Sequence, residues 1–115
     1  MSYRVLITAP ARAQILEQGR YIAVERQAPL NAARWLERVF DAADTLADFP
    51  RRCALAPEND FRDYEIRRLL IGDYFLLFTI LEEDQTVWVI GFRHGSRLPR
   101  PNELPDEPPT QGSEQ

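Results

Sequence analysis

A short stretch of polar side chains suited to binding anions or moving protons follows an apolar run late in the sequence. Residues 87–97 read VWVIGFRHGSR, which places Arg93, His94 and Arg97 within five positions. An imidazole changes its charge near neutral pH, and a guanidinium binds phosphate or carboxylate through two parallel hydrogen bonds. These residue types are therefore candidates for an anion-binding or acid–base site.

A second polar group lies earlier, in the stretch YEIRRLL of residues 64–70. RNA cleavage without a metal requires a base for the 2′-hydroxyl, an acid for the leaving 5′-oxygen and positive charge beside the phosphorane. If the two stretches lie close in one sheet, His94 can serve as acid or base and Glu65 as base. Arg67, Arg93 or Arg97 would then supply the positive charge.

A structural explanation of the same residues competes with the catalytic one. A histidine beside arginines is commonly an exposed polar group, and Arg67 and Arg68 can be strand residues that pair with Glu65 and Asp63. Side chains alternate along a strand, so Arg67 and Arg68 are expected on opposite faces of the sheet. We take five residues as candidates for binding a target: Arg67, Arg68, Arg93, His94 and Arg97.

The first half of the chain predicts one strand and two helices. Residues 3–8 are β-prone, and helical spacing of apolar residues follows over residues 10–27. Pro29 opens a second helix, which should end before Phe49-Pro50 because a residue preceding proline is disfavoured in a helix. The short connection between the helices predicts a hairpin.

The second half predicts three consecutive strands, at residues 64–70, 74–81 and 86–92. Their connections have the length of β-hairpin turns, which indicates an antiparallel meander. The middle strand is nearly all apolar and should be central, covered by the helices. The predicted fold class is α+β, with an N-terminal strand, a two-helix hairpin and a three-stranded antiparallel meander forming one sheet.

Charge and composition divide the chain at residue 97. The whole sequence holds 14 arginines and 18 acidic residues, but residues 98–115 contain one arginine and four acids. This leaves residues 1–97 nearly neutral, with 13 basic and 14 acidic groups. We expect one domain over residues 1–97 and a flexible, Pro-rich acidic tail over residues 98–115.

Several function classes lack their sequence signals. The sequence has no Gly-rich phosphate loop, no HExxH or GxSxG motif and no cluster of metal ligands, so we expect neither a cofactor nor a metal. The single cysteine, Cys53, fits a half-buried thiol. No apolar run approaches the roughly 20 residues that cross a bilayer, and the N-terminus lacks a secretory signal. We therefore expect a cytoplasmic protein that does not enter a membrane.

The order and spacing of several short motifs resemble the RelE/ParE superfamily, the toxins of bacterial type II toxin–antitoxin modules, also called plasmid stabilisation proteins. The similarity runs from Tyr3 to about Arg97. Its motifs are Tyr21-Ile22, Ala32-Ala33, Leu46, Phe49-Pro50, Glu65-Ile66-Arg67, Tyr74 and the ending V-x-V-I-x-x-x-H-G-x-R from Val87.

The resemblance implies a toxin that is neutralised by a co-expressed antitoxin and reaches DNA only through it. RelE-like members are ribosome-dependent mRNA endonucleases, whereas ParE-like members poison DNA gyrase. This chain departs from the nuclease pattern: it is nearly neutral, it has Phe75 where an arginine is common, and it ends in LPRPNELPD instead of a basic cluster. We therefore favour a ParE-like inhibitor of gyrase, with an mRNA endonuclease acting on the ribosome as the alternative.

The antitoxin is expected to bind apolar groups that the sheet and the helix hairpin leave exposed. Large aromatic residues in these elements are the candidates, although each also suits a core position. These candidates are Trp35, Trp88 and Phe92.

Overall fold

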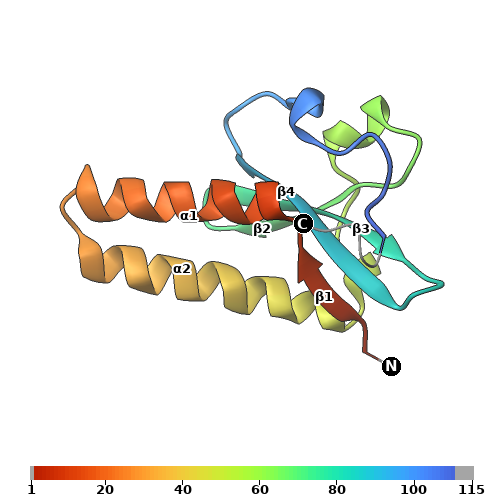
Figure 1. Ribbon diagram of the computed structural model, residues 1–115, viewed down its shortest axis with the longest axis horizontal. Coiled ribbons are helices and arrows are strands. Elements are labelled where there is room, and N and C mark those ends of the chain that lie inside the picture. The colour runs from red at the N-terminus through yellow and green to blue at the C-terminus, as the bar shows by residue number, and fades with distance from the viewer. Residues whose placement is uncertain (1, 111–115) are drawn as a thin grey trace.

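The computed structural model describes residues 2–110 and arranges four strands in one sheet, with two helices packed on one of its faces (Figure 1). The strand order is β1-β4-β3-β2. The predicted α+β fold, with its N-terminal strand, helix hairpin and meander, is confirmed. The elements are β1 (Arg4–Ile7), α1 (Ala9–Val24), α2 (Pro29–Asp44), β2 (Arg67–Ile71), β3 (Tyr74–Leu81) and β4 (Thr86–His94).

The first strand forms one edge of the sheet, beside β4. β1 runs parallel to β4, from Arg4 opposite Thr86 to Ile7 opposite Val89, while β3 and β4 are antiparallel. β4 thus has neighbours on both sides along its first half and carries apolar side chains on both faces, as expected for a central strand. None of the described helices is long and apolar enough to cross a membrane.

Local sequence signals define where the helices begin and how closely they pack. The Thr8 hydroxyl accepts a hydrogen bond from the Ala11 N–H and caps α1, and Pro10 occupies the first turn, where its missing N–H costs nothing. Gly19 faces α2, where a Cβ atom would lie 2.9 Å from Cγ of Leu36. The glycine therefore permits the close contact between the helices.

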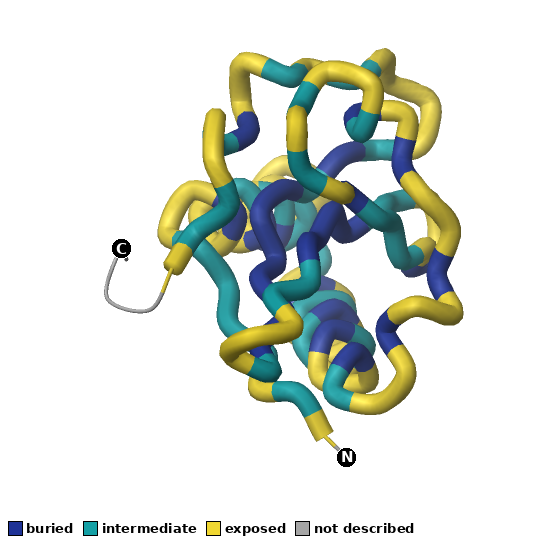
Figure 2. Tube along the Cα trace, turned by 90° about the vertical axis from the view of Figure 1, so that its right-hand side faces the viewer, coloured by how far each residue is buried: buried dark blue, intermediate teal, exposed yellow. Residues whose placement is uncertain are grey.

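Apolar side chains form a core on each face of the sheet. On the helix side, Ile15 and Val39 pack against Phe78 and Val89. On the opposite side, which we call the second face, Trp88 and Ile90 belong to a separate cluster. Figure 2 shows the buried strands between two covering layers.

The loop after α2 and the C-terminal segment cover the second face. Ile66 and Leu104 are both buried there, and Figure 1 shows the two segments together at the top of the view. The sequence patterns predict no cover for this face. Its cover comes from irregular segments, which carry no periodic apolar pattern.

Several predicted boundaries differ from the structure by a few residues: α1 ends at Val24 and not at residue 27, and β4 continues to His94 and not only to residue 92. β2 begins at Arg67 and not at residue 64, because the Ile66 N–H donates to the Asn59 side chain and the Ile66 carbonyl accepts from the Ala56 N–H. Packing also continues beyond Arg97, since Leu104 is buried in the second-face cluster.

The part of the predicted tail that the structure describes lies against the domain. The Arg62 guanidinium donates to the carbonyls of Pro101, Leu104 and Pro105, and the Tyr64 hydroxyl donates to the same Pro105 carbonyl at 2.6 Å. A flexible tail beginning at residue 98 is thus not what the structure has, because Leu104 buries its side chain and Arg62 binds its main chain. Residues 111–115 lie outside the described part.

Candidate functional site

A groove of about 930 Å³ opens between α1, the second half of β4 and the chain that follows it. We call it the β4 groove. The residues that line it include Gln14, Glu17, Gln18 and Tyr21 from α1, Gly91, Phe92, Arg93 and His94 from β4, and Ser96, Arg97, Arg100, Glu103 and Leu104 from the C-terminal segment. Of the nine candidate residues, the structure brings four together here: Phe92, Arg93, His94 and Arg97.

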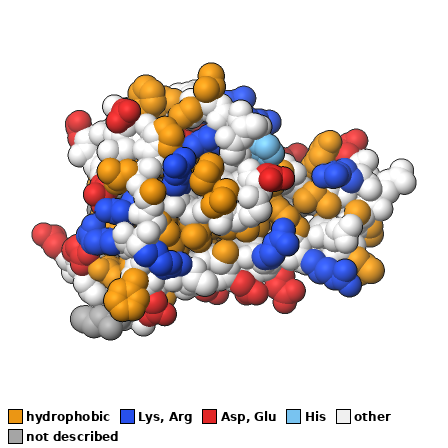
Figure 3. Space-filling model, turned by 180° about the vertical axis from the view of Figure 1, so that it is seen from behind, with side chains coloured by type: hydrophobic (Ala, Val, Ile, Leu, Met, Phe, Trp, Pro, Cys, Tyr) orange, Lys and Arg blue, Asp and Glu red, His pale blue; other side chains and the backbone are white. Residues whose placement is uncertain are grey.

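His94 is held by the turn that it begins. Its Nδ1 atom accepts a hydrogen bond from the Ser96 N–H at 3.0 Å and lies 2.6 Å from the Ser96 hydroxyl oxygen. Because a backbone N–H can only donate, the proton of the neutral imidazole resides on Nε2. The ring meets Tyr74 edge to face at 5.0 Å between centroids and is visible at the surface as the single histidine (Figure 3).

The phenol of Tyr74 is neutral over the physiological pH range. Burial, reinforced by the charge of Asp73, raises the pKa of this phenol above its usual value of 10.0, against the opposing effects of Arg26 and Arg97. Tyr74 therefore packs against His94 as an uncharged ring.

Arg93 points into the protein and its charge is matched there. Its Nε atom lies 2.6 Å from Oε2 of Glu58, and its Nη2 atom lies 3.3 Å from Oε1 of the same carboxylate. Arg93 is 9% exposed and Glu58 is 1% exposed. Its remaining Nη1 atom donates to the Arg97 carbonyl at 2.9 Å. Arg93 thus fixes the turn after β4 and does not present a free charge to the groove.

Arg97 differs from Arg93 in having a free side chain. Its main chain closes the turn, since its N–H donates to the His94 carbonyl at 3.0 Å. Among residues 2–110 its guanidinium forms no hydrogen bond or ion pair, whereas Arg100 lies 3.4 Å from Glu103. Arg97 is therefore available to an anionic partner.

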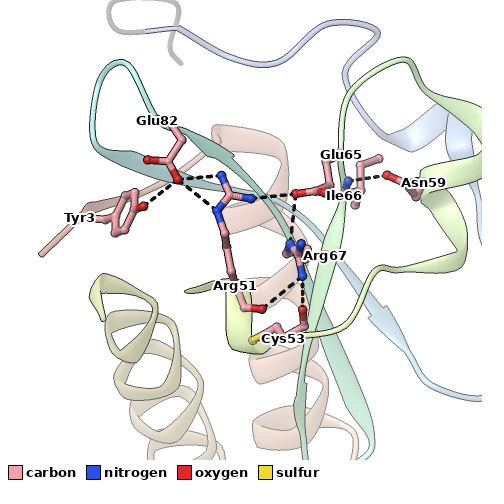
Figure 4. Close-up of polar contacts among 8 residues, drawn as sticks. All are labelled: Tyr3, Arg51, Cys53, Asn59, Glu65, Ile66, Arg67 and Glu82. Carbon is pink, nitrogen blue, oxygen red and sulfur yellow. Dashed lines mark hydrogen bonds and ion pairs between the residues drawn. The ribbon is translucent and has the colours of Figure 1, made fainter. Parts of the chain in front are cut away.

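The other residues of the hypothetical RNase site lie elsewhere. Glu65 and Arg67 belong to a network with Arg51 near the start of β2, where Arg67 also donates to the Cys53 carbonyl at 2.5 Å (Figure 4). The network continues from Arg51 to Glu82 and Tyr3. Within this network the carboxylates of Glu65 and Glu82 pair with the guanidinium groups of Arg51 and Arg67 at the surface.

The sheet register gives the separation between the two regions. Arg67 is opposite Phe78 and His94 is opposite Tyr74, so the two Cα atoms lie four residues apart along the sheet and two strands apart across it. With strand spacings of about 4.8 Å and a rise of about 3.3 Å per residue, the distance is about 16 Å. One phosphate cannot contact both Glu65 and His94 in this arrangement.

The remaining candidates serve mainly in packing. The Arg68 guanidinium stacks over the ring of Phe75 at 4.8 Å. Trp88 is 5% exposed in the second-face cluster, and its indole N–H has no hydrogen-bond partner among the described residues. Trp35 and Phe92 meet edge to face at 5.7 Å beside the helix-side core.

Two groups of groove residues were not singled out in the sequence. Gln14, Glu17, Gln18 and Tyr21 recur at the spacing of one helix face, so a search for polar periodicity in α1 would have found them. Glu58 had no such signal, because its partner Arg93 is 35 positions away. Among the described residues, no group of three or more His, Cys, Asp or Glu is placed to hold a metal ion.

Comparison with solved structures defines the class of this fold. The chain is similar to a chromosomal ParDE system from P. aeruginosa, with a TM-score of 0.61, 12% identity and coverage of 81% of this chain and 96% of that one. It is also similar to the RelE-RelB complex of Pyrococcus horikoshii OT3, with a TM-score of 0.54, 16% identity and coverage of 85% and 100%. The chain is similar as well to the RelBE2 toxin–antitoxin complex of Mycobacterium tuberculosis, with a TM-score of 0.57, 23% identity and coverage of 82% of this chain and 92% of that one.

The match to a family model is more specific than the shared fold. Residues 5–99 match the model of the ParE toxin of the type II toxin–antitoxin system parDE, while no curated protein matches the chain significantly. The protein therefore belongs to the ParE toxin family, within the RelE/ParE superfamily that the motifs indicated.

Proposed function

We propose that this protein is a growth-inhibiting toxin that acts by poisoning DNA gyrase and is held inactive by a cognate antitoxin protein. In this proposal the toxin binds its target and carries out no reaction of its own. Family membership supports the toxin class, and the ParDE and RelBE complexes among the similar structures support an antitoxin as partner.

The observation that carries the choice of gyrase over RNA is the dispersal of the RNase candidates. Glu65 and Arg67 share an ion-pair network about 16 Å from His94, and the charge of Arg93 is matched by Glu58. Of the RNase candidates, only His94 and Arg97 line the groove without an ion pair to another residue among residues 2–110. The nearly neutral charge of residues 1–97 also disfavours binding in a ribosomal RNA cleft.

Growing cells can separate the two mechanisms. The toxin is induced alone while a DNA-damage reporter and the 5′ ends of a translated mRNA are followed in parallel. A gyrase poison raises the reporter and leaves the mRNA intact, because broken DNA accumulates while translation continues. Early mRNA cuts at codon-spaced positions, with no reporter response, would contradict the proposal. Co-induction of the neighbouring antitoxin gene should restore growth.

The alternative, a RelE-like mRNA endonuclease, is kept because His94 and the unpaired Arg97 line the same groove. In that case His94 acts either as the base that takes the proton of the 2′-hydroxyl or as the acid that protonates the leaving 5′-oxygen. Arg97 then stabilises the negative charge on the phosphate. His94→Gln should then abolish mRNA cutting on ribosomes without unfolding the protein. A variant as toxic as the wild type removes this alternative.

A further inference from the structure

Phe49 presents its aromatic ring to solvent just beyond the second helix. α2 is followed by a short 3-10 turn, Thr45–Ala47, and Phe49 comes two residues after that turn. The residue is 83% exposed, whereas its neighbour Pro50 is fully buried. A phenyl ring that projects this far contributes little to the core. Packing within the domain therefore does not explain a phenylalanine at this position.

The backbone conformation of Phe49 is also one that a large side chain disfavours. Its φ is 50° and its ψ is 55°, in the left-handed region. Glycine adopts this region freely, whereas a bulky residue is an outlier there. Because the ring is exposed, its burial does not offset the cost of this conformation. A strained residue without a role in packing is typical of a binding site.

The Arg52 side chain holds this strained conformation in place. Its Nη1 atom donates to the carbonyls of Asp48 at 2.7 Å and Phe49 at 3.2 Å, and its Nη2 atom donates to the Thr45 hydroxyl at 3.0 Å. The Arg52 N–H also donates to the Phe49 carbonyl, at 3.0 Å. Since Pro50 is buried on the other side, the main chain is fixed both before and after Phe49. A rigid support of this kind lowers the entropy that binding costs.

Phe49 lies toward the opposite end of the sheet from the β4 groove. The Tyr3 N–H donates to the Ala47 carbonyl at 2.8 Å, and β1 begins opposite Thr86, the first residue of β4. Figure 1 accordingly shows the end of α2 beside the start of β1. The groove begins at Gly91, which is about 16 Å along β4 from Thr86. The exposed ring and the groove are therefore separate features of the surface.

We propose that Phe49 inserts into an apolar pocket on gyrase and anchors the toxin to its target. A single projecting ring fits a concave pocket, which a folded enzyme such as gyrase can offer and an extended segment cannot. The ring is flanked by the exposed side chains of Asp48 and Arg52, one of each charge. An aromatic centre with a polar rim is the usual composition of a protein–protein interface. This inference rests on the gyrase target of the proposed function.

Phe49→Gly tests the anchor without harming the fold. Glycine suits the left-handed backbone, so the Tm of the variant should be no lower than that of the wild type. With purified gyrase, ATP and supercoiled plasmid, the toxin concentration that linearises half of the plasmid should rise at least about tenfold. Phe61→Ala removes another exposed aromatic ring, on the loop that covers the second face, and should stay within about threefold of the wild type.

The two variants and the antitoxin separate the possible outcomes. Equal plasmid linearisation by Phe49→Gly and wild type would overturn the anchor while gyrase poisoning stands. A lower Tm for Phe49→Gly would show that the ring supports the fold, and would overturn it as well. So would weaker antitoxin binding with unchanged linearisation, because the ring would then contact the antitoxin. If the wild type itself produces no linear plasmid, the proposed function fails and this inference fails with it.

Discussion

The Glu58 carboxylate and the Arg93 guanidinium form an ion pair in the interior, with a distance of 2.6 Å between Oε2 and Nε. Glu58 comes from the loop that covers the second face, and Arg93 comes from the central strand. Through its third contact, to the Arg97 carbonyl, the pair also holds the turn that carries His94. The covering loop and the floor of the β4 groove are therefore mechanically connected.

Glu58→Gln should destabilise the protein strongly. The substitution keeps the shape of the side chain but leaves the Arg93 charge buried without a counter-charge, which typically costs about 3 to 5 kcal/mol. Urea unfolding followed by circular dichroism measures the loss. Glu83→Gln removes an exposed carboxylate and should change stability by about 0.5 kcal/mol or less. A Glu58→Gln variant as stable as this control would show that the pair is not needed for folding.

Gly19→Ala should destabilise the helix hairpin although alanine is the better helix former. Alanine gains about 1 kcal/mol of helix propensity over glycine, but its Cβ would lie 2.9 Å from Cγ of Leu36. Overpacking of this kind costs about 1 to 3 kcal/mol. The combined variant Gly19→Ala, Leu36→Ala relieves the clash and should show a smaller loss than the sum of its single changes. A Tm above that of the wild type for Gly19→Ala alone would contradict the close contact.

Glu82→Gln should lower stability at neutral pH and not in acid. Hydrogen bonds from Arg51, and then from Tyr3, lower the pKa of the Glu82 carboxyl below its usual 4.5 in the folded protein. A depressed folded-state pKa gives stability that is present above the unfolded-state pKa and is lost as pH falls through the folded value. The Tm difference between wild type and variant should thus be present at pH 7 and shrink progressively as the pH falls below the usual carboxyl pKa of 4.5. A difference that is constant across this range would mean that the ionised carboxylate contributes nothing.

The sequence predicts the elements well because their signals are local. The apolar run of residues 74–81 has the same limits in β3, and Pro10 and Pro29 mark the starts of both helices. The cover of the second face was missed because Ile66 and Leu104 are single apolar residues in irregular segments. An isolated apolar side chain carries no period from which its burial can be predicted.

The candidate site was predicted only in part, for a related reason. His94 and Arg97 follow the end of a recognisable strand, so their place at one end of the sheet could be expected. Whether Arg93 is free or paired depends on Glu58, a contact between distant parts of the chain. The separation of Glu65 from His94 likewise depends on strand register, which local patterns do not determine.

The most direct test of gyrase poisoning uses purified toxin, gyrase, ATP and supercoiled plasmid, with protein–DNA adducts released by detergent and protease. A poison stabilises the cleaved intermediate, so we expect linear plasmid to accumulate with toxin concentration and to disappear when antitoxin is added first. His94→Gln should leave this activity within about threefold of the wild type, because the proposed toxin transfers no proton. Unchanged supercoiling and no linear plasmid at a large molar excess of folded toxin would contradict the proposed function.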